Sequence, residues 1–173
     1  MASPSTTLPD ARLVVTGTAP DGTSIFTSDD TRKPFAPFGP AGSRFLVFHA
    51  SPAVPASNTA PVPELAADLP RCPPGGVAFC VTDIPPGGSA PLHRTQSMDY
   101  GVVLAGEVVL GLDGGAEKTI RAGDFLVQRG ANHTWHNRTQ ETCRIMGVMV
   151  GTEQIVLADG TVLEATVFGK KPE

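Results

Sequence analysis

Two side chains that could bind a metal or carry a proton lie close together between residues 91 and 108. His93 stands two residues before Thr95, and Asp99 follows after a short connection. Side chains two apart in a β-strand point to the same face, so His93 and Thr95 share a face, and Asp99 opens the next strand. An imidazole and a carboxylate on adjacent strands of a barrel can converge inside it. The stretch therefore holds half of a metal site, with Thr95 in the place of a second histidine.

A second group of polar side chains follows in the stretch GDFLVQRGANHTWHN. His133, Trp135 and Asn137 share one face of a predicted strand, and Thr134 and His136 share the other. Trp135 can be a core residue or a pocket wall, and both readings stay open. Asn137 can line a pocket or serve as a structural hydrogen-bonding residue. His136 is expected at the surface or against another sheet.

The elements that must position these residues are short strands. Apolar runs rich in Val, Ile, Phe and Thr alternate with turn residues, and the 173 residues include 19 Gly and 17 Pro. LDGG at 112–115 and ADG at 158–160 are typical of hairpin turns. Strands at a spacing of roughly 8–12 residues predict an antiparallel sandwich or barrel. The length suits one domain with a sizeable core.

Residues 51–75 differ from the rest, because they carry seven prolines. Proline removes a backbone donor, so this segment is not expected inside a sheet. It is interpreted as a long ordered loop or a cover over the barrel or a partner. The alternative is a flexible linker between two domains.

Charge and cysteine content exclude several classes of protein. The net charge is −4 without a basic cluster, which argues against nucleic acid and anionic membrane surfaces. No apolar run reaches the roughly 20 residues of a membrane helix. The start lacks the pattern of a secretory signal, and three cysteines is an odd number, so we expect reduced thiols and a cytoplasmic location. No Walker loop or dinucleotide-binding glycine motif is found, so no nucleotide cofactor is expected.

The spacing of these residues resembles the cupin superfamily, a family of small jelly-roll barrels. The first family motif, G-x5-H-x-H-x3/4-E-x6-G, reads here Gly87-x5-His93-x-Thr95-x3-Asp99-x6-Gly106. The second, G-x5-P-x-G-x2-H-x3-N, reads here Gly123-x4-Gln128-x-Gly130-x2-His133-x3-Asn137. The sequence pattern HRTxSxDYGxVLxGEV also resembles that of a subgroup of single-domain small-molecule cupins. The resemblance implies an all-β fold, a cupin double-stranded β-helix or jelly-roll barrel over residues 76–173. Residues 1–75 would add N-terminal strands and the Pro-rich loop, packing on the barrel or on a partner subunit.

The resemblance also implies a divalent metal, because cupin sites typically use three histidines and a glutamate. His93, Asp99 and His133 retain three of these positions, and Gln128 is a possible fourth ligand. Two imidazoles and a carboxylate suit Fe, Zn, Mn or Ni. Thr95, Gln128, Trp135 and Asn137 are expected to line the substrate pocket. The alternative is a pocket without metal, in which the same residues are satisfied polar groups.

These residues favour a small-molecule enzyme of secondary metabolism. In such an enzyme a metal or a His–Asp pair polarises a carbonyl and moves protons. We expect a lyase or isomerase that decarboxylates, dehydrates or isomerises an oxo or phenolic acid. An Fe(II) dioxygenase and a non-catalytic ligand-binding cupin are the alternatives. A homodimer is also expected, because open β-sandwiches need their sheet edges protected.

Overall fold

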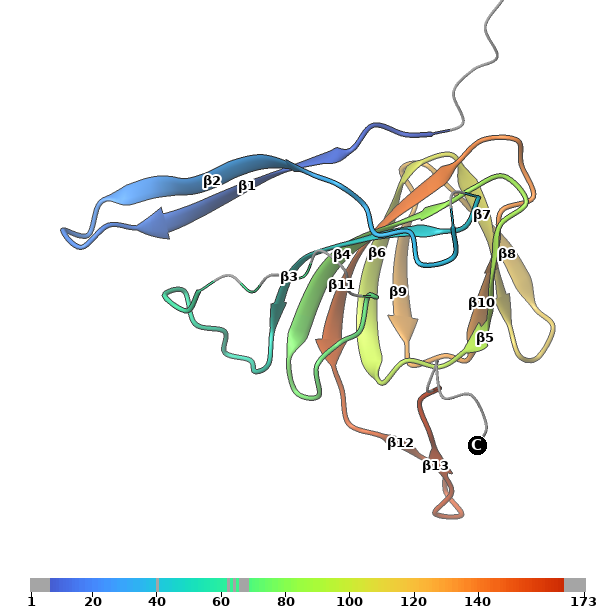
Figure 1. Ribbon diagram of the computed structural model, residues 1–173. Helices are drawn as coiled ribbons and strands as arrows, with labels where there is room; N and C mark the ends of the chain where they lie inside the picture. The colour runs from blue at the N-terminus through green and yellow to red at the C-terminus, as the bar shows by residue number, and fades with distance from the viewer. Residues whose placement is uncertain (1–6, 40, 62, 64, 66–68, 167–173) are drawn as a thin grey trace, which may run out of the picture.

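The architecture is all-β, as a computed structural model of the chain shows (Figure 1). The structure describes residues 7–39, 41–61, 63, 65 and 69–166. Thirteen strands and no helix occur among these residues, and two of the sheets face each other as a barrel. The prediction of a jelly-roll barrel is confirmed. Within the same residues, no helix is present that is long and apolar enough to cross a membrane.

One wall of the barrel is a five-stranded antiparallel sheet with the order β3-β4-β11-β6-β9. Its strands, in that order, span Arg44–Ser51, Val77–Ile84, Cys143–Gly151, Ser97–Ala105 and Phe125–Arg129. The other wall is a four-stranded sheet with the order β5-β10-β7-β8. Its strands span Ser89–His93, His133–His136, Glu107–Leu112 and Glu117–Arg121. The two motif stretches therefore contribute strands to both walls.

The main core lies between the two walls. Val103 from β6 packs with Val108 and Leu110 from β7, and with Ile120 from β8. All four side chains are buried, and burial of a Val, Leu or Ile side chain contributes roughly 1.5–3 kcal/mol. The turn between β6 and β7 depends on Gly106, which has a φ of +70° and lies against the carbonyl of Thr142; a Cβ there would sit 2.8 Å from that oxygen. The last glycine of the first motif is therefore required by its backbone conformation and by close packing.

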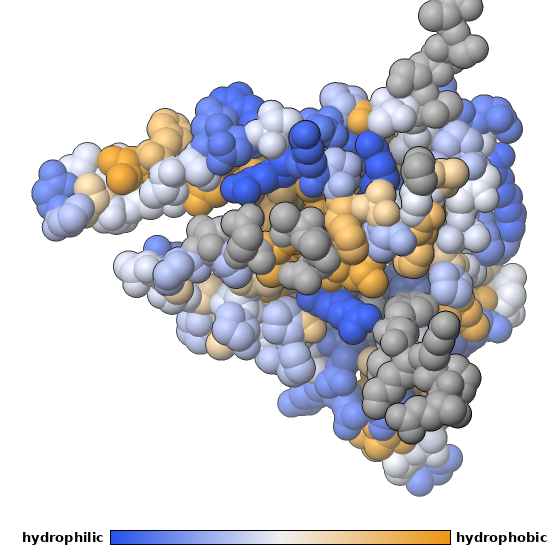
Figure 2. Space-filling view, viewed as in Figure 1, coloured by the Kyte–Doolittle hydropathy of each residue, from blue (hydrophilic) through white to orange (hydrophobic). Residues whose placement is uncertain are grey.

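Two N-terminal strands, β1 (Ala11–Thr18) and β2 (Ser24–Arg32), form a hairpin that extends away from the barrel (Figure 1). We call this hairpin the arm. At its root, Leu13 packs against Leu46, Phe48 and Val81, which lie on the outer face of the five-stranded sheet. Figure 2 shows apolar residues on the arm and on the adjoining surface of the barrel.

The described part of the Pro-rich segment forms no strand, as expected. Its end packs onto the barrel through Cys72, which contacts the buried side chains of Ala78, Cys80 and Met149. Its start is joined to its end by a hydrogen bond from the Val54 amide to the Gly75 carbonyl. At the opposite end of the chain, β12 (Ile155–Val156) and β13 (Val162–Leu163) form a short hairpin beyond one end of the barrel (Figure 1).

A buried ionic group ties the N-terminal region to the barrel. Asp83 is buried and accepts hydrogen bonds from Arg44 at 2.6 Å and from Arg144 at 2.6 and 2.8 Å. The same two guanidinium groups donate to the carbonyls of Leu8 and Pro9. One carboxylate thus pairs with two arginines that hold the chain before the arm.

The Asp83→Asn substitution should destabilise the fold strongly, since it leaves two partly buried arginines without a counter-charge. Breaking a buried pair by removing one partner costs about 3–5 kcal/mol. Urea unfolding followed by circular dichroism measures the loss.

Asp29→Asn is the matched control, because it makes the same chemical change in the exposed pair of Asp29 with Arg12. Its urea midpoint should stay close to that of the wild type. Equal midpoints for the two variants would contradict the assigned role of Asp83.

Candidate functional site

The two imidazoles meet because of strand pairing. β5 ends at His93 and β10 begins at His133, and these two residues are Cα partners in the antiparallel pair. Their ring centroids lie 4.1 Å apart. The structure therefore brings together the two histidines that the motifs singled out.

Each imidazole is oriented by a backbone carbonyl. The Nδ1 atom of His133 lies 2.9 Å from the Ala131 oxygen, and that of His93 lies 2.7 Å from the Pro91 oxygen. A carbonyl only accepts, so in the neutral rings Nδ1 carries the proton and Nε2 keeps a lone pair. His133 is 2% exposed, and this burial lowers its pKa to about 4, while its hydrogen bond to Ala131 acts in the opposite direction. At neutral pH its Nε2 is therefore an acceptor.

Asp99 is the carboxylate of the site. It lies on β6 opposite Gln128 of β9. Its Oδ1 accepts a hydrogen bond from Ser97 at 2.5 Å, and its Oδ2 accepts from Thr95 at 3.3 Å and from Gln128 at 3.2 Å. Burial raises the pKa of Asp99, and these three hydrogen bonds counteract the rise.

Gln128 connects the carboxylate to the histidines. Its Nε2 lies 3.2 Å from Asp99 Oδ2 and 3.2 Å from His133 Nε2. The side chain is 5% exposed, and its Oε1 atom is buried without a hydrogen-bond partner among the described residues. We refer to His93, Asp99, Gln128 and His133 as the His–Gln–Asp cluster.

The remaining predicted pocket residues differ in their relation to the cluster. Thr95 contacts Asp99 directly. Trp135 stands edge-on to His133, with centroids 5.8 Å apart, and also packs on the main core. Asn137 is engaged elsewhere, since its amide donates to the carbonyls of Ile84 and Glu141 and accepts from Thr139. These bonds give Asn137 a structural role at the turn after β10.

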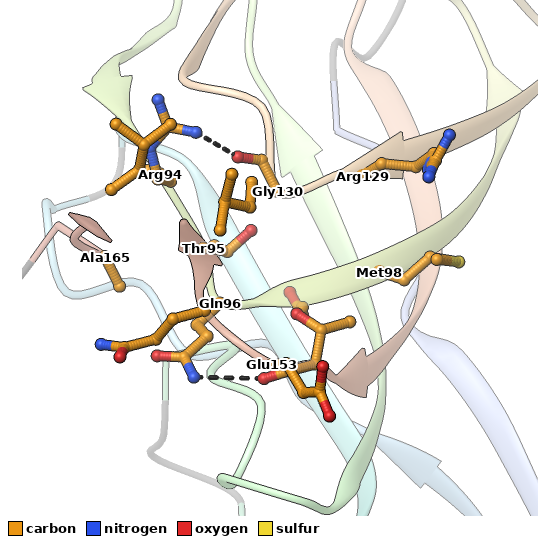
Figure 3. Close-up of a pocket in the computed structure, with 13 residues that line it drawn as sticks. Arg94, Thr95, Gln96, Met98, Arg129, Gly130, Glu153 and Ala165 are labelled. Atoms are coloured by element: carbon orange, nitrogen blue, oxygen red, sulfur yellow. Dashed lines mark hydrogen bonds between the residues drawn. The ribbon is translucent and has the colours of Figure 1, made fainter. Parts of the chain in front are cut away.

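A cavity of about 160 Å³ is lined by Thr95 (Figure 3), and none of the four cluster residues is part of its lining. Its walls are residues 94–98 and 129–130 on one side, and residues 152–155, 163 and 165 on the other. The second wall is held by hydrogen bonds between Arg94 and Thr166 and by the bond from Gln96 to the Thr152 carbonyl. Inside the barrel, the cavity beside Trp135 measures only about 10 Å³ and is apolar.

Sequence reasoning missed two parts of this arrangement. Ser97 makes the shortest contact to Asp99, and its position two residues before Asp99 on the same strand was an available signal. The C-terminal wall of the cavity had no such signal, because residues 152–166 reach Thr95 only through the chain fold.

The three cysteines are packing residues, and the thiols of Cys72 and Cys80 donate hydrogen bonds to backbone carbonyls. All three are free, and Cys80 and Cys143 are buried, as expected for core thiols. Burial raises the pKa of Cys72 to about 11 and those of Cys80 and Cys143 to about 12. The thiols are therefore protonated at neutral pH, which argues against a nucleophilic role.

The cluster contains the kinds of ligand atoms that bind a divalent metal. In their present positions, however, these atoms do not form a metal site. Both histidines donate Nδ1–H to a carbonyl, the arrangement usual for metal-ligating imidazoles, and the buried Gln128 Oε1 lacks a donor. Among the described residues, however, no three His, Cys, Asp or Glu side chains converge closely enough to hold a metal ion. The Gln128 amide nitrogen contacts both Asp99 and His133.

Comparison with known proteins matches residues 80–151 to the family model described as "Cupin domain". The cupin-domain-containing oxidoreductase srdB of Neurospora crassa is 32% identical over 141 residues, covering 80% of this chain and 71% of the relative. Phomopsin biosynthesis cluster protein D of Diaporthe leptostromiformis is 52% identical over 66 residues, covering 38% of this chain and 35% of the relative.

Matches to several curated relatives cover only 35% to 45% of the relatives' length. Among solved structures, the Cnp3 cupin domain of Schizosaccharomyces pombe aligns with a TM-score of 0.52 and 10% identity, over 81% of this chain and 87% of that chain. At that identity the likeness supports the fold alone.

The buried, neutral state of His133 predicts a pH dependence of stability in metal-free protein. Between pH 6.5 and about 4 the unfolded chain binds a proton at this residue that the folded chain does not. The free energy of unfolding should therefore fall as the pH falls through this window, by up to about 3 kcal/mol. The raised pKa of Asp99 has the opposite sign, so the His133 contribution must be measured separately.

An NMR titration of the imidazole carbons in EDTA separates the two contributions. The His133 signal should stay neutral down to about pH 4, whereas a midpoint near 6.5 would contradict its burial. In urea unfolding, the His133→Gln variant should lose most of the acid-dependent destabilisation between pH 6.5 and 4.

Proposed function

The chain belongs to the cupin superfamily, and from this premise we propose that it is a metal-assisted small-molecule enzyme of secondary metabolism. The proposed reaction is a lyase or isomerase step on an oxo or phenolic acid, by decarboxylation, dehydration or isomerisation. The name of one relative, phomopsin biosynthesis cluster protein D, supports the pathway class.

The observation that carries this proposal is the His–Gln–Asp cluster beside a cavity. Burying polar side chains costs free energy unless they are satisfied, yet His133 and Gln128 are almost fully buried and Gln128 Oε1 has no partner among the described residues. Thr95 borders the cavity and contacts Asp99. Thr95 thus lies between the cavity and the Asp99 carboxylate, so a substrate in the cavity would have to pass Thr95 to reach the cluster.

The residues have distinct proposed roles. Asp99 takes a proton from the substrate or returns one, because a carboxylate with a raised pKa is a better base than an exposed carboxylate. Thr95 orients the substrate by a hydrogen bond, and Trp135 holds the His133 ring in place. His93, His133, Asp99 and Gln128 would hold a divalent Fe, Zn, Mn or Ni ion. When bound, such an ion supplies a Lewis acid that polarises a carbonyl or enolate oxygen.

A second candidate function is an Fe(II) dioxygenase. The relatives named as cupin-domain-containing oxidoreductases favour it. Two imidazoles and one carboxylate also form the usual ligand set of non-haem Fe(II) oxygenases. Oxygen uptake by the iron-loaded protein with candidate acids separates the two, because a lyase or isomerase of this kind consumes none. A non-catalytic ligand-binding cupin would turn over no acid under either condition.

The metal part of the proposal predicts the outcome of a substitution. His133→Ala should remove most of the bound metal while the fold survives, because one of the two imidazole ligands is lost. Elemental analysis of protein purified without a histidine tag measures the stoichiometry, and circular dichroism checks the fold.

The control is His136→Ala, since His136 lies on the same strand and its Nε2 contacts Thr134 instead of the cluster. Its metal content should match the wild type. Equal loss in both variants, or full retention in His133→Ala, would argue against the assigned ligand set.

We also propose that the protein is a homodimer. On the outer face of the five-stranded sheet, the arm packs with a cluster of side chains from β3, β4 and β11. On β6 and β9 it leaves Tyr100, Phe125 and Val127 exposed, and β9 is an edge strand. The arm itself exposes Phe26. Apolar surface on both elements supports a two-fold pairing in which the arm of one copy covers the sheet of the other.

Light scattering at micromolar concentration tests the dimer. The wild type should have twice the mass of one chain, and the double variant Phe125→Asp/Val127→Asp should have the mass of one. Leu112→Asp places a charge at an exposed site on the other sheet and should leave the dimer intact. A monomeric wild type would contradict the proposal.

A further inference from the structure

The Gln128 side chain is the centre of the His–Gln–Asp cluster. A single atom, its Nε2, contacts both the Asp99 carboxylate and the His133 ring nitrogen, each at 3.2 Å. Gln128 lies on β9 opposite Asp99, and His133 follows five residues later at the start of β10. Its amide therefore stands between elements of both walls of the barrel.

The hydrogen-bond inventory decides which end of the amide faces the cluster. His133 Nδ1 donates to Ala131, so His133 Nε2 accepts. Asp99 Oδ2 also accepts. An amide nitrogen has two hydrogens and can donate to both acceptors, whereas an amide oxygen can donate to neither. The nitrogen must therefore face the cluster in the metal-free protein, and the oxygen is left buried without a partner among the described residues.

The two acceptors that Gln128 joins are also two of the proposed metal ligands. A cation would need the same lone pairs, and metal ligands lie roughly 2.0–2.2 Å from the ion. The hydrogens of the amide nitrogen already occupy these lone pairs, with nitrogen–acceptor distances of 3.2 Å. An ion can bind there only if these hydrogens turn away.

We propose that Gln128 controls metal entry by exchanging the two ends of its amide. In the metal-free protein the nitrogen joins Asp99 to His133, and in the loaded protein the oxygen faces the ion as a neutral ligand. The two ends have nearly the same size and shape, so the exchange requires a turn of the terminal amide and little movement of the strand. The inference rests on the metal site of the proposed function and adds a residue that sets its affinity.

Substitutions of Gln128 should change the affinity of the protein for Co²⁺ in a defined order. Gln128→Glu offers an acceptor at either end and carries a negative charge, so it should bind Co²⁺ more tightly than the wild type, by about tenfold or more. Gln128→Met keeps a similar length without a hard oxygen donor and should bind more weakly. Without metal, Gln128→Glu places a second carboxylate beside Asp99, so its melting temperature should fall and Co²⁺ should raise it more than in the wild type.

The experiment titrates Co²⁺ alone into the metal-free full-length protein. Trp135 is the only tryptophan and stands edge-on to His133, so quenching of its fluorescence reports ion binding at the cluster. Co²⁺ absorption gives the ligand environment, and melting temperatures with and without Co²⁺ give a second readout. Gln140→Glu, the same change at an exposed turn, is the matched control and should equal the wild type in every measurement.

The possible results separate the inference from the function on which it rests. The exchange is supported if Gln128→Glu binds Co²⁺ more tightly than the wild type and Gln128→Met binds it more weakly. Equal affinity of the wild type and both Gln128 variants overturns it while leaving the metal site in place. Absence of binding in the wild type and in Gln128→Glu overturns both the inference and the metal-dependent function. A loss of melting temperature in Gln140→Glu equal to that in Gln128→Glu would assign the effect to net charge and also overturn the inference.

Discussion

The pairing of β5 with β10 is the constraint on which the site depends, because it sets His133 opposite His93. In a strand a slip of one residue turns every side chain to the other face. Such a slip would move His133 and Trp135 out of the barrel and bring Thr134 and His136 in. Leu110 lies opposite Trp135 in the adjoining pair of β10 with β7, so the main core and the cluster are held by the same register.

This register has an electrostatic consequence. Two imidazoles with centroids 4.1 Å apart cannot both be charged without repulsion, and burial further disfavours the charged form of His133. Asp99 is also buried, but hydrogen bonds from Ser97, Thr95 and Gln128 compensate part of the cost. The result is a cluster in which the imidazole lone pairs and the carboxylate are acceptors. The Gln128 amide, in turn, supplies the donors between Asp99 and His133.

The parts outside the barrel are attached to it at both ends of the described chain. The N-terminal region is held by Asp83 and its two arginines, and its arm covers part of the five-stranded sheet. The C-terminal segment is held at Arg94 and completes the cavity beside Thr95. Both attachments join residues far apart in the sequence, and the C-terminal one reaches the first motif at Arg94 and Gln96.

Local patterns in the sequence were enough to determine the strands and their turns, since alternation of apolar residues and glycine turns are properties of neighbouring residues. The motif spacing also identified His93, Asp99 and His133, and the resemblance it carries supplied the jelly roll. Only the tertiary structure decided three other features. Gln128 contacts both Asp99 and His133, Asn137 forms its hydrogen bonds away from the cluster, and residues 152–165 form a wall of the cavity. The physical reason is that a side chain's partners depend on strand register and on which atoms donate, and these are set when distant segments pair.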